Sequence, residues 1–178
     1  SSGHTVLMDR YRILSYQTAI EGRLEVGTEV GHNLGTLSGS GTLALVTNKL
    51  PVGDYSTFFS CSGGAVEYGG NSSYTIPTEY DTYRKMVISG IGTKTFDGPY
   101  NRYFCDTLLI KSGATLSNLY MIRLYGEFIL EPTASFNAGN RWVMALGSNI
   151  QNIEGEFSAS SALKTLYVSN SAGINMDS

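Results

Sequence analysis

The stretch GAVEYGGNSSYTIPTEYDTYRKMVI, residues 64–88, contains two short segments in which apolar and polar side chains alternate. These segments are Ala65–Tyr68 and Lys85–Ile88, and their first inward residues, Val66 and Met86, are 20 residues apart. Alternation over four residues is typical of a strand with one buried face. Glycine and polar residues fill the interval, as turns require. The stretch therefore predicts two strands that recur at the period of one repeat.

Segments of this kind recur along most of the chain at nearly constant spacing. Their first inward residues are separated by 19, 23, 20, 22 and 20 residues, a mean near 21, and Ile150 continues the series 22 residues later. These inward residues are Leu24, Leu43, Val66, Met86, Leu108 and Phe128. Such a period predicts coils that stack, with the inward residues in one internal column.

The fold class that follows is all-β: a single-stranded parallel β-helix, or β-solenoid, with about 21 residues per coil and a right-handed winding. We expect residues 1–178 to form one such domain. An antiparallel β-sandwich is the alternative, because it also combines short strands with glycine turns. The solenoid is favoured because Leu37–Thr42 (LSGSGT) returns as Ile88–Thr93 (ISGIGT) and because only Asp97-Gly98 carries a hairpin signal.

The start of the chain carries weaker signals. Residues 1–21 are expected to form an N-terminal cap, with a short helix between Asp9 and Glu21 as the best helical candidate. The first residues lack a signal-peptide core, and no apolar run approaches the roughly 20 residues that a membrane-spanning helix needs. We therefore expect no transmembrane segment, and either a removed signal or a fragment of a longer surface protein.

Residues 63–96, GGAVEYGGNSSYTIPTEYDTYRKMVISGIGTKTF, resemble a repeat of large secreted surface proteins of Bacteroidetes bacteria. The shared features are a Gly-x-Val-x-Tyr strand, an Ile-Pro step, a Ser-Gly turn and a Gly-Thr-Lys-Thr segment, and Ser112–Leu116 resembles the strand that follows. Arg84-Lys85 and Phe96 depart from the repeat, which usually has Asn-Leu and Leu there. The resemblance implies a β-helix from an exported adhesin or filamentous surface component, secreted or held at the cell surface.

Charge and cysteine spacing argue against several function classes. With 12 Lys+Arg against 15 Asp+Glu and no basic cluster, the chain is not expected to bind nucleic acid. Cys61 and Cys105 belong to no Cys-x-x-Cys or Cys/His motif, so zinc is not expected. Strict stacking places the two cysteines about two coils, or roughly 9.6 Å, apart, beyond the reach of a disulfide. We therefore predict two unpaired, mostly buried thiols.

The acidic and histidine side chains form no catalytic constellation in the sequence. Four glutamates are outward candidates on the strands: Glu25, Glu67, Glu127 and Glu131. They do not recur at matching positions of successive coils, as a hydrolase pair would, and we expect them to serve solubility. His4 and His32 are expected to face solvent or to cap turns. The isolated aspartates are Asp54, Asp81, Asp97 and Asp106. We predict no enzyme activity, no cofactor and no metal beyond incidental calcium.

Aromatic residues are the remaining candidates for binding. Nine tyrosines lie in or near the strand segments: Tyr55, Tyr68, Tyr74, Tyr80, Tyr83, Tyr100, Tyr103, Tyr120 and Tyr125. Tyrosine favours strands, so most of them are expected to pack, while exposed ones would stack on sugars or proteins. Trp142 lies in the apolar run 141–146 and is expected in the core. Ice binding requires repeated Thr-x-Thr on a flat face, and only Thr93-Lys94-Thr95 fits.

These patterns predict a non-catalytic extracellular surface module that serves as an adhesin or display stalk. The alternatives are a carbohydrate-binding or carbohydrate-active β-helix module and a segment similar to a phage tail fibre. The expected partner is a host or environmental glycan or a protein surface. Open strand edges also favour end-to-end or self-association. The sequence alone assigns no ligand-binding residue.

Overall fold

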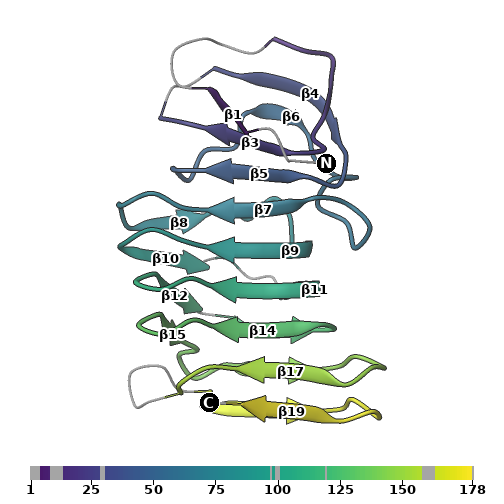
Figure 1. Cartoon of the computed structure of the whole chain (residues 1–178), viewed down its shortest axis with the longest axis vertical. Helices are drawn as coiled ribbons and strands as arrows, with labels where there is room; N and C mark the ends of the chain where they lie inside the picture. Colours follow the sequence, from purple (N-terminus) through teal and green to yellow (C-terminus); the bar gives the residue numbers. More distant parts are fainter. Residues whose placement is uncertain are drawn as a thin grey trace.

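The computed structural model describes residues 5–8, 14–28, 31–96, 98, 101–118, 120–157 and 163–177. Within these ranges the alternating segments form strands, and every strand pairing is parallel. No described residue belongs to a helix, and accordingly no helix there has the length and apolarity to cross a membrane. Figure 1 shows the coils stacked along one axis from the N-terminal to the C-terminal end, which confirms the predicted β-solenoid.

One face of the solenoid, the main face, runs its whole length. Its strands are β1 (Thr5–Met8), β3 (Arg23–Val26), β5 (Thr42–Leu45), β7 (Ala65–Tyr68), β9 (Thr82–Ile88), β11 (Arg102–Ile110), β14 (Glu127–Leu130), β17 (Gln151–Glu154) and β19 (Ile174–Asp177). The near strands in Figure 1 run leftward as the chain descends, and β8 and β10 return to the right behind them, so the winding is right-handed.

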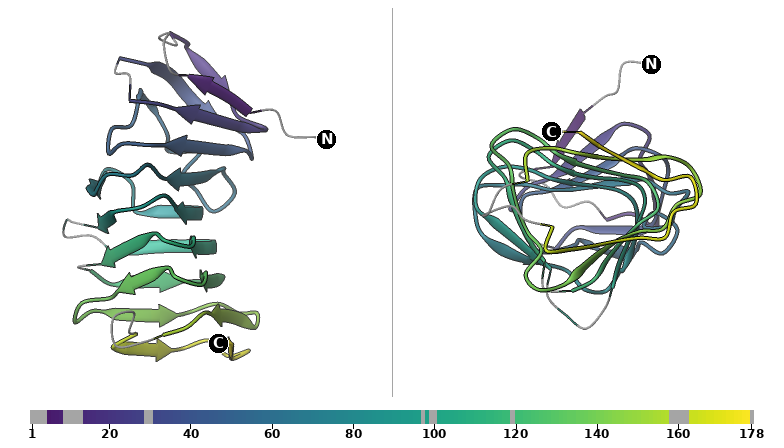
Figure 2. Two further views of the ribbon diagram at one scale, coloured as in Figure 1. Left: turned by 60° about the vertical axis from the view of Figure 1, so that its left-hand side comes forward. Right: turned by 90° about the horizontal axis from the view of Figure 1, so that it is seen from below.

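The other strands form three shorter groups around the axis, which Figure 2 shows end-on. The upper sheet is β2 (Gln17–Ala19), β4 (Asn33–Ser38) and β6 (Val52–Asp54). The ring face is β13 (Ile122–Leu124), β16 (Trp142–Ala145) and β18 (Thr165–Val168), together with the N-terminal ends of β9 and β11. The third face is β8 (Tyr74–Ile76), β10 (Thr93–Phe96), β12 (Thr115–Asn118) and β15 (Ser135–Asn137).

The predicted internal column is confirmed from Leu24 to Phe128. The strand register pairs Leu24 with Leu43, Leu43 with Val66, Val66 with Met86, Met86 with Leu108 and Leu108 with Phe128. Each of these residues is at most 8% exposed, so the column forms a continuous apolar core. The prediction fails at Ile150, which is 63% exposed. Ile153 takes its place because the coil after Phe128 is longer, at 25 residues.

The predicted N-terminal helix is wrong where the structure describes it. Residues 9–13 lie outside the described residues, but Gln17–Ala19 form β2 and pair with Thr36–Ser38 of β4. The Thr18 hydroxyl also donates to the Leu34 carbonyl oxygen at 2.8 Å. These bonds pair β2 with the next coil. The stabilisation they provide outweighs the weak helical pattern of this segment.

The prediction of unpaired thiols is also wrong, because Cys61 and Cys105 form a disulfide with their Cα atoms 5.3 Å apart. A separation of about two coils holds only if both cysteines lie on the regular coil. Cys61 instead lies in an insertion, residues 55–64, that separates β6 from β7, whereas residues 39–41 alone make the corresponding turn between β4 and β5. The insertion reaches across the intervening coil, so the disulfide forms while the strands remain stacked.

Aromatic side chains of the insertion pack on the coil that follows and form the insertion cluster: Tyr55, Phe58, Phe59, Tyr80 and Tyr83. The Phe59 ring lies 4.8 Å from the Tyr80 ring and 5.3 Å from the Tyr83 ring, centroid to centroid. The Tyr55 amide donates to the Tyr80 hydroxyl at 3.1 Å. Burial raises the pKa of Tyr55 and of Tyr83 well above the ordinary range of a phenol.

Candidate functional site

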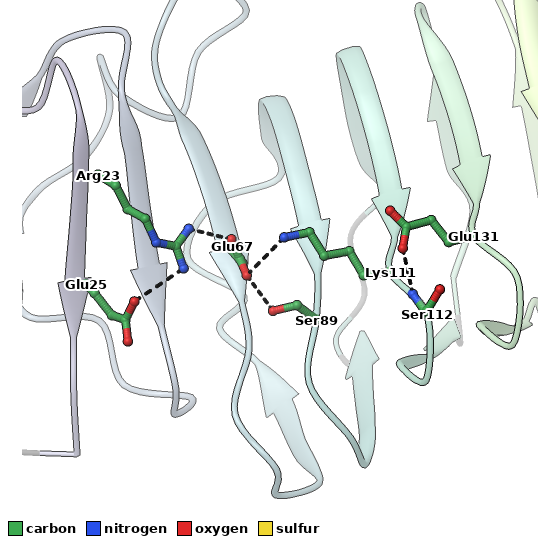
Figure 3. A network of polar contacts seen from close by, with 7 residues as sticks. All are labelled: Arg23, Glu25, Glu67, Ser89, Lys111, Ser112 and Glu131. Carbon is green, nitrogen blue, oxygen red and sulfur yellow. Dashed lines mark hydrogen bonds and ion pairs between the residues drawn. The ribbon is translucent and has the colours of Figure 1, made fainter. Parts of the chain in front are cut away.

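Glu67, an outward acid predicted to serve solubility, instead anchors an ion network on the main face (Figure 3). One of its carboxylate oxygens accepts from Arg23 Nη1 at 2.6 Å, and the other accepts from the Ser89 hydroxyl at 2.6 Å and lies 3.6 Å from Lys111 Nζ. Ala44 and Val87 flank Glu67 in the strand register. Because these neighbours are uncharged and short, the long side chains of Arg23 and Lys111 reach over them.

The Glu67 carboxylate is charged despite being only 8% exposed. Burial by itself would raise its pKa, but hydrogen bonds from Arg23 and Ser89 and the charges of Arg23 and Lys111 outweigh burial, so the pKa lies below its usual range. Glu25 lies 3.4 Å from Arg23 Nη2, and Glu131 accepts from the Ser112 amide at 2.9 Å (Figure 3). Glu67 and Glu131 therefore link different coils, whereas Glu25 contacts an arginine of its own strand.

The other predicted titratable candidates are scattered through the fold. His32 is buried, contrary to expectation, because the next coil lies on it and the Val52 amide donates to its carbonyl oxygen at 2.8 Å. Asp54 accepts from the Ser56 amide at 3.0 Å, and Asp81 and Asp106 contact the threonines that follow them. His4 and Asp97 lie outside the described residues. No three His, Cys, Asp or Glu residues of the described ranges gather as metal ligands would.

Trp142, predicted to be in the core, lies on the outside of the ring face and is 47% exposed. In the strand Trp142–Ala145 the inward residues are Val143 and Ala145, which are buried, so the alternation turns the indole outward. Tyr167 of the next strand is also 47% exposed, and the two rings stack with centroids 6.1 Å apart and planes 17° from parallel. The Trp142 indole, the largest apolar side chain of the segment, is therefore exposed to solvent.

Two arginines of the ring face pack on further aromatic rings. The Arg123 guanidinium lies 5.1 Å from the Tyr103 ring centroid, and its Nη1 donates to the Tyr103 hydroxyl at 2.9 Å. The Arg141 guanidinium lies 5.7 Å from the Tyr120 ring centroid. Such cation–π contacts hold a guanidinium in place while leaving its charge without a carboxylate partner. No ion pair within the described residues includes either arginine.

A cavity of about 290 Å³ opens beside these rings. It is lined by Asn101, Tyr120, Met121, Asn140, Arg141 and Trp142. Apolar rings, two amides and one guanidinium thus meet at one concave place, the combination that orients a polar ligand against an apolar surface. These residues come from three successive coils, which is why sequence reasoning missed the site.

The remaining tyrosines divide between core and surface. Tyr68 is buried with Tyr55 and Tyr83, whereas Tyr125 is 43% exposed. Tyr74 is half-buried and donates its hydroxyl hydrogen to the Gly69 carbonyl oxygen at 2.9 Å. Tyr100 lies outside the described residues. Among the predicted candidates that the structure describes, Tyr103 and Tyr120 contact the arginines of the ring face.

The third face carries short polar side chains in register. One column of this face takes one outward residue from each strand and consists of Thr75, Thr95, Ser117 and Asn137. Lys94 lies between Thr93 and Thr95 in β10 and points inward. Its Nζ donates to the carbonyl oxygens of Gly70 and Ile91 at 2.8 and 2.7 Å. Of Thr93-Lys94-Thr95, only the two threonines therefore contribute to this surface, which carries both hydroxyl and amide groups.

Comparison with protein families, with curated proteins and with solved structures yields no match to this chain.

Proposed function

We propose that this chain is a non-catalytic module of an exported bacterial surface protein, in which the solenoid is a rigid stalk and the ring face attaches to an extracellular ligand. The proposal is carried by one observation: Trp142 and Tyr167 are each 47% exposed and stack on each other on two paired parallel strands of the solenoid. Exposed aromatic rings on a rigid scaffold contribute strongly to recognition, because they lose little conformational freedom on binding.

Two further observations support the proposal. The disulfide between Cys61 and Cys105 is of the kind that persists in oxidising compartments, which favours export. Glu67 and Glu25, which a catalytic interpretation would use, are engaged by Arg23 within the main face. An acid held in this way by a permanent cation is poorly suited to exchange protons during turnover.

The test uses the whole chain, immobilised on a sensor and offered a panel of polysaccharides and extracellular proteins. We expect saturable binding to a member of the panel, at least tenfold weaker for the double variant Trp142→Ala/Tyr167→Ala. The variant Tyr16→Ala, which removes a 97% exposed tyrosine outside the ring face, is the matched control and should bind normally. A reducing-sugar assay runs in parallel. New reducing ends, or a panel on which nothing binds, would overturn the proposal.

A further inference from the structure

We infer that the ring face binds an anionic polysaccharide, a chain of sugars that carry carboxylate or sulfate groups. This inference depends on the proposed function, since it names the ligand of the same surface. It follows from three independent properties of the face: its rings, its charge and its amides.

The face carries a column of outward aromatic, thioether and guanidinium side chains. Met144 pairs with Tyr167 and Arg123 pairs with Met144 in the strand register, so a column of outward residues runs along the solenoid axis from Tyr103. With parallel strands about 4.8 Å apart, the four residues of this column span roughly 14 Å. The C–H faces of pyranose rings pack on aromatic and thioether groups of this kind. The column has the length of a short run of sugars.

The charge of the face is positive, although the chain as a whole has a formal charge of -3. Arg123, Arg141 and Lys164 lie on or beside the ring face, and residues 120–124, 138–146 and 163–168 contain no aspartate or glutamate. Lys164 Nζ lies 3.4 Å from the amide oxygen of Asn140, which lines the cavity. Because no acid in these segments neutralises the three cations, they favour a ligand that carries negative charge.

The amides of Asn101 and Asn140 complete the site, because they line the same cavity as Arg141 and Trp142. An amide both donates and accepts hydrogen bonds, which suits the hydroxyl groups of a sugar. A guanidinium donates two parallel hydrogen bonds to a carboxylate or a sulfate. Sugar hydroxyls, sugar C–H faces and an acidic group would each meet a matching group within about 290 Å³.

Single-stranded nucleic acid is the nearest rival, because it also combines stacking with negative charge. The sugar amphiphile, apolar on one side and hydroxylated on the other, matches the cavity better than a base does.

The experiment measures binding of the whole chain by calorimetry to four probes: polygalacturonate, dextran sulfate, unmodified dextran and an oligothymidylate. We expect binding to polygalacturonate, to dextran sulfate or to both, with affinity that falls as salt rises and at least tenfold preference over dextran. The first two probes distinguish carboxylate from sulfate recognition. Trp142→Ala and Arg141→Ala should each weaken binding about tenfold or more, and circular dichroism should show both variants folded.

Matched controls are Tyr16→Ala for the ring and Lys49→Ala for the cation, since both side chains are exposed outside the ring face. Equal affinity for dextran, or preference for oligothymidylate, would overturn the inference while leaving a binding function in place. Binding of the anionic polysaccharides that is insensitive to Arg141→Ala would also overturn it. Failure to bind any of these probes, together with binding of a protein in the broader panel, rejects the anionic polysaccharide but retains the proposed function.

Discussion

The insertion cluster and the ring face use the same kinds of residue in opposite ways. In the insertion cluster Tyr55, Phe58 and Phe59 are at most 4% exposed and belong to the segment that the disulfide ties to β11. On the ring face Trp142 and Tyr167 are each 47% exposed. Both sets of rings lie on coils of the same solenoid. Aromatic content therefore does not distinguish buried rings from exposed rings here, and the presence of a covering segment does.

The largest expected effect comes from removing the disulfide. The double variant Cys61→Ser/Cys105→Ser should lose about 4 kcal/mol of unfolding free energy, the chain-entropy value for a loop of 44 residues. Urea denaturation measures the loss. The binding proposed for the ring face should remain unchanged in the folded variant. A loss below about 1 kcal/mol would mean that the insertion packs equally well without its cross-link.

Truncating one ring from each region sharpens the comparison. Phe59→Ala should cost about 3 kcal/mol, because it removes a buried ring that contacts Tyr80 and Tyr83. Tyr167→Ala should change stability by less than about 0.5 kcal/mol, because nearly half of the residue is exposed and its ring packs on another exposed ring. Thermal and urea denaturation of both variants provide the measurement. Similar losses in the two variants would contradict the distinction between covered and open rings.

Alkaline pH should weaken the covered region through its buried phenols. Burial, with a smaller contribution from Tyr80, raises the pKa of Tyr55 above that of an unfolded tyrosine. The unfolded chain therefore loses protons first, and stability that is fully present below about pH 10 falls as the pH rises further. Tyr55→Phe should reduce this fall, at a cost near neutral pH of about 1 kcal/mol for the lost bond to the Pro51 carbonyl oxygen. Melting curves from pH 8 to 11 test both points.

The smallest effect concerns the environment of the only tryptophan of the chain. Because Trp142 is 47% exposed beside Arg141, the difference between iodide and caesium quenching of its fluorescence should exceed that of free N-acetyltryptophanamide. Arg141→Ala should reduce that difference, whereas Lys49→Ala should not. A difference no larger than that of N-acetyltryptophanamide would argue against a positive surface at the indole.

Sequence patterns predicted the regular part of the fold and failed where the coil departs from its mean length. Leu43, Val66 and Met86 were placed correctly because alternation and a period near 21 residues both determine their position. Ile150 was misplaced because the spacing was extrapolated through a coil of 25 residues. The disulfide was missed for the same reason, since strict stacking has no place for an insertion.

The ring face was harder to predict than the core. Trp142 was assigned to the core on hydrophobicity, although Val143 and Ala145 alternate with it and indicate that it faces outward. Tyr103 and Arg123 are 20 residues apart, and only the strand register brings them together. Sequence alternation thus gives the direction of each side chain, while its neighbours depend on the length of every intervening turn.

The cross-link between the insertion and β11 has a mechanical consequence. Coils of a solenoid contact only their neighbours, so tension applied to the two ends would peel them away one at a time. A covalent bond between Cys61 and Cys105 shortens the length of chain that tension can draw out, because residues 62–104 lie inside the closed loop. The segment containing β7 and β9 would therefore be shielded from the pull, and extension would stop short of the full contour length until the sulfur bridge is reduced.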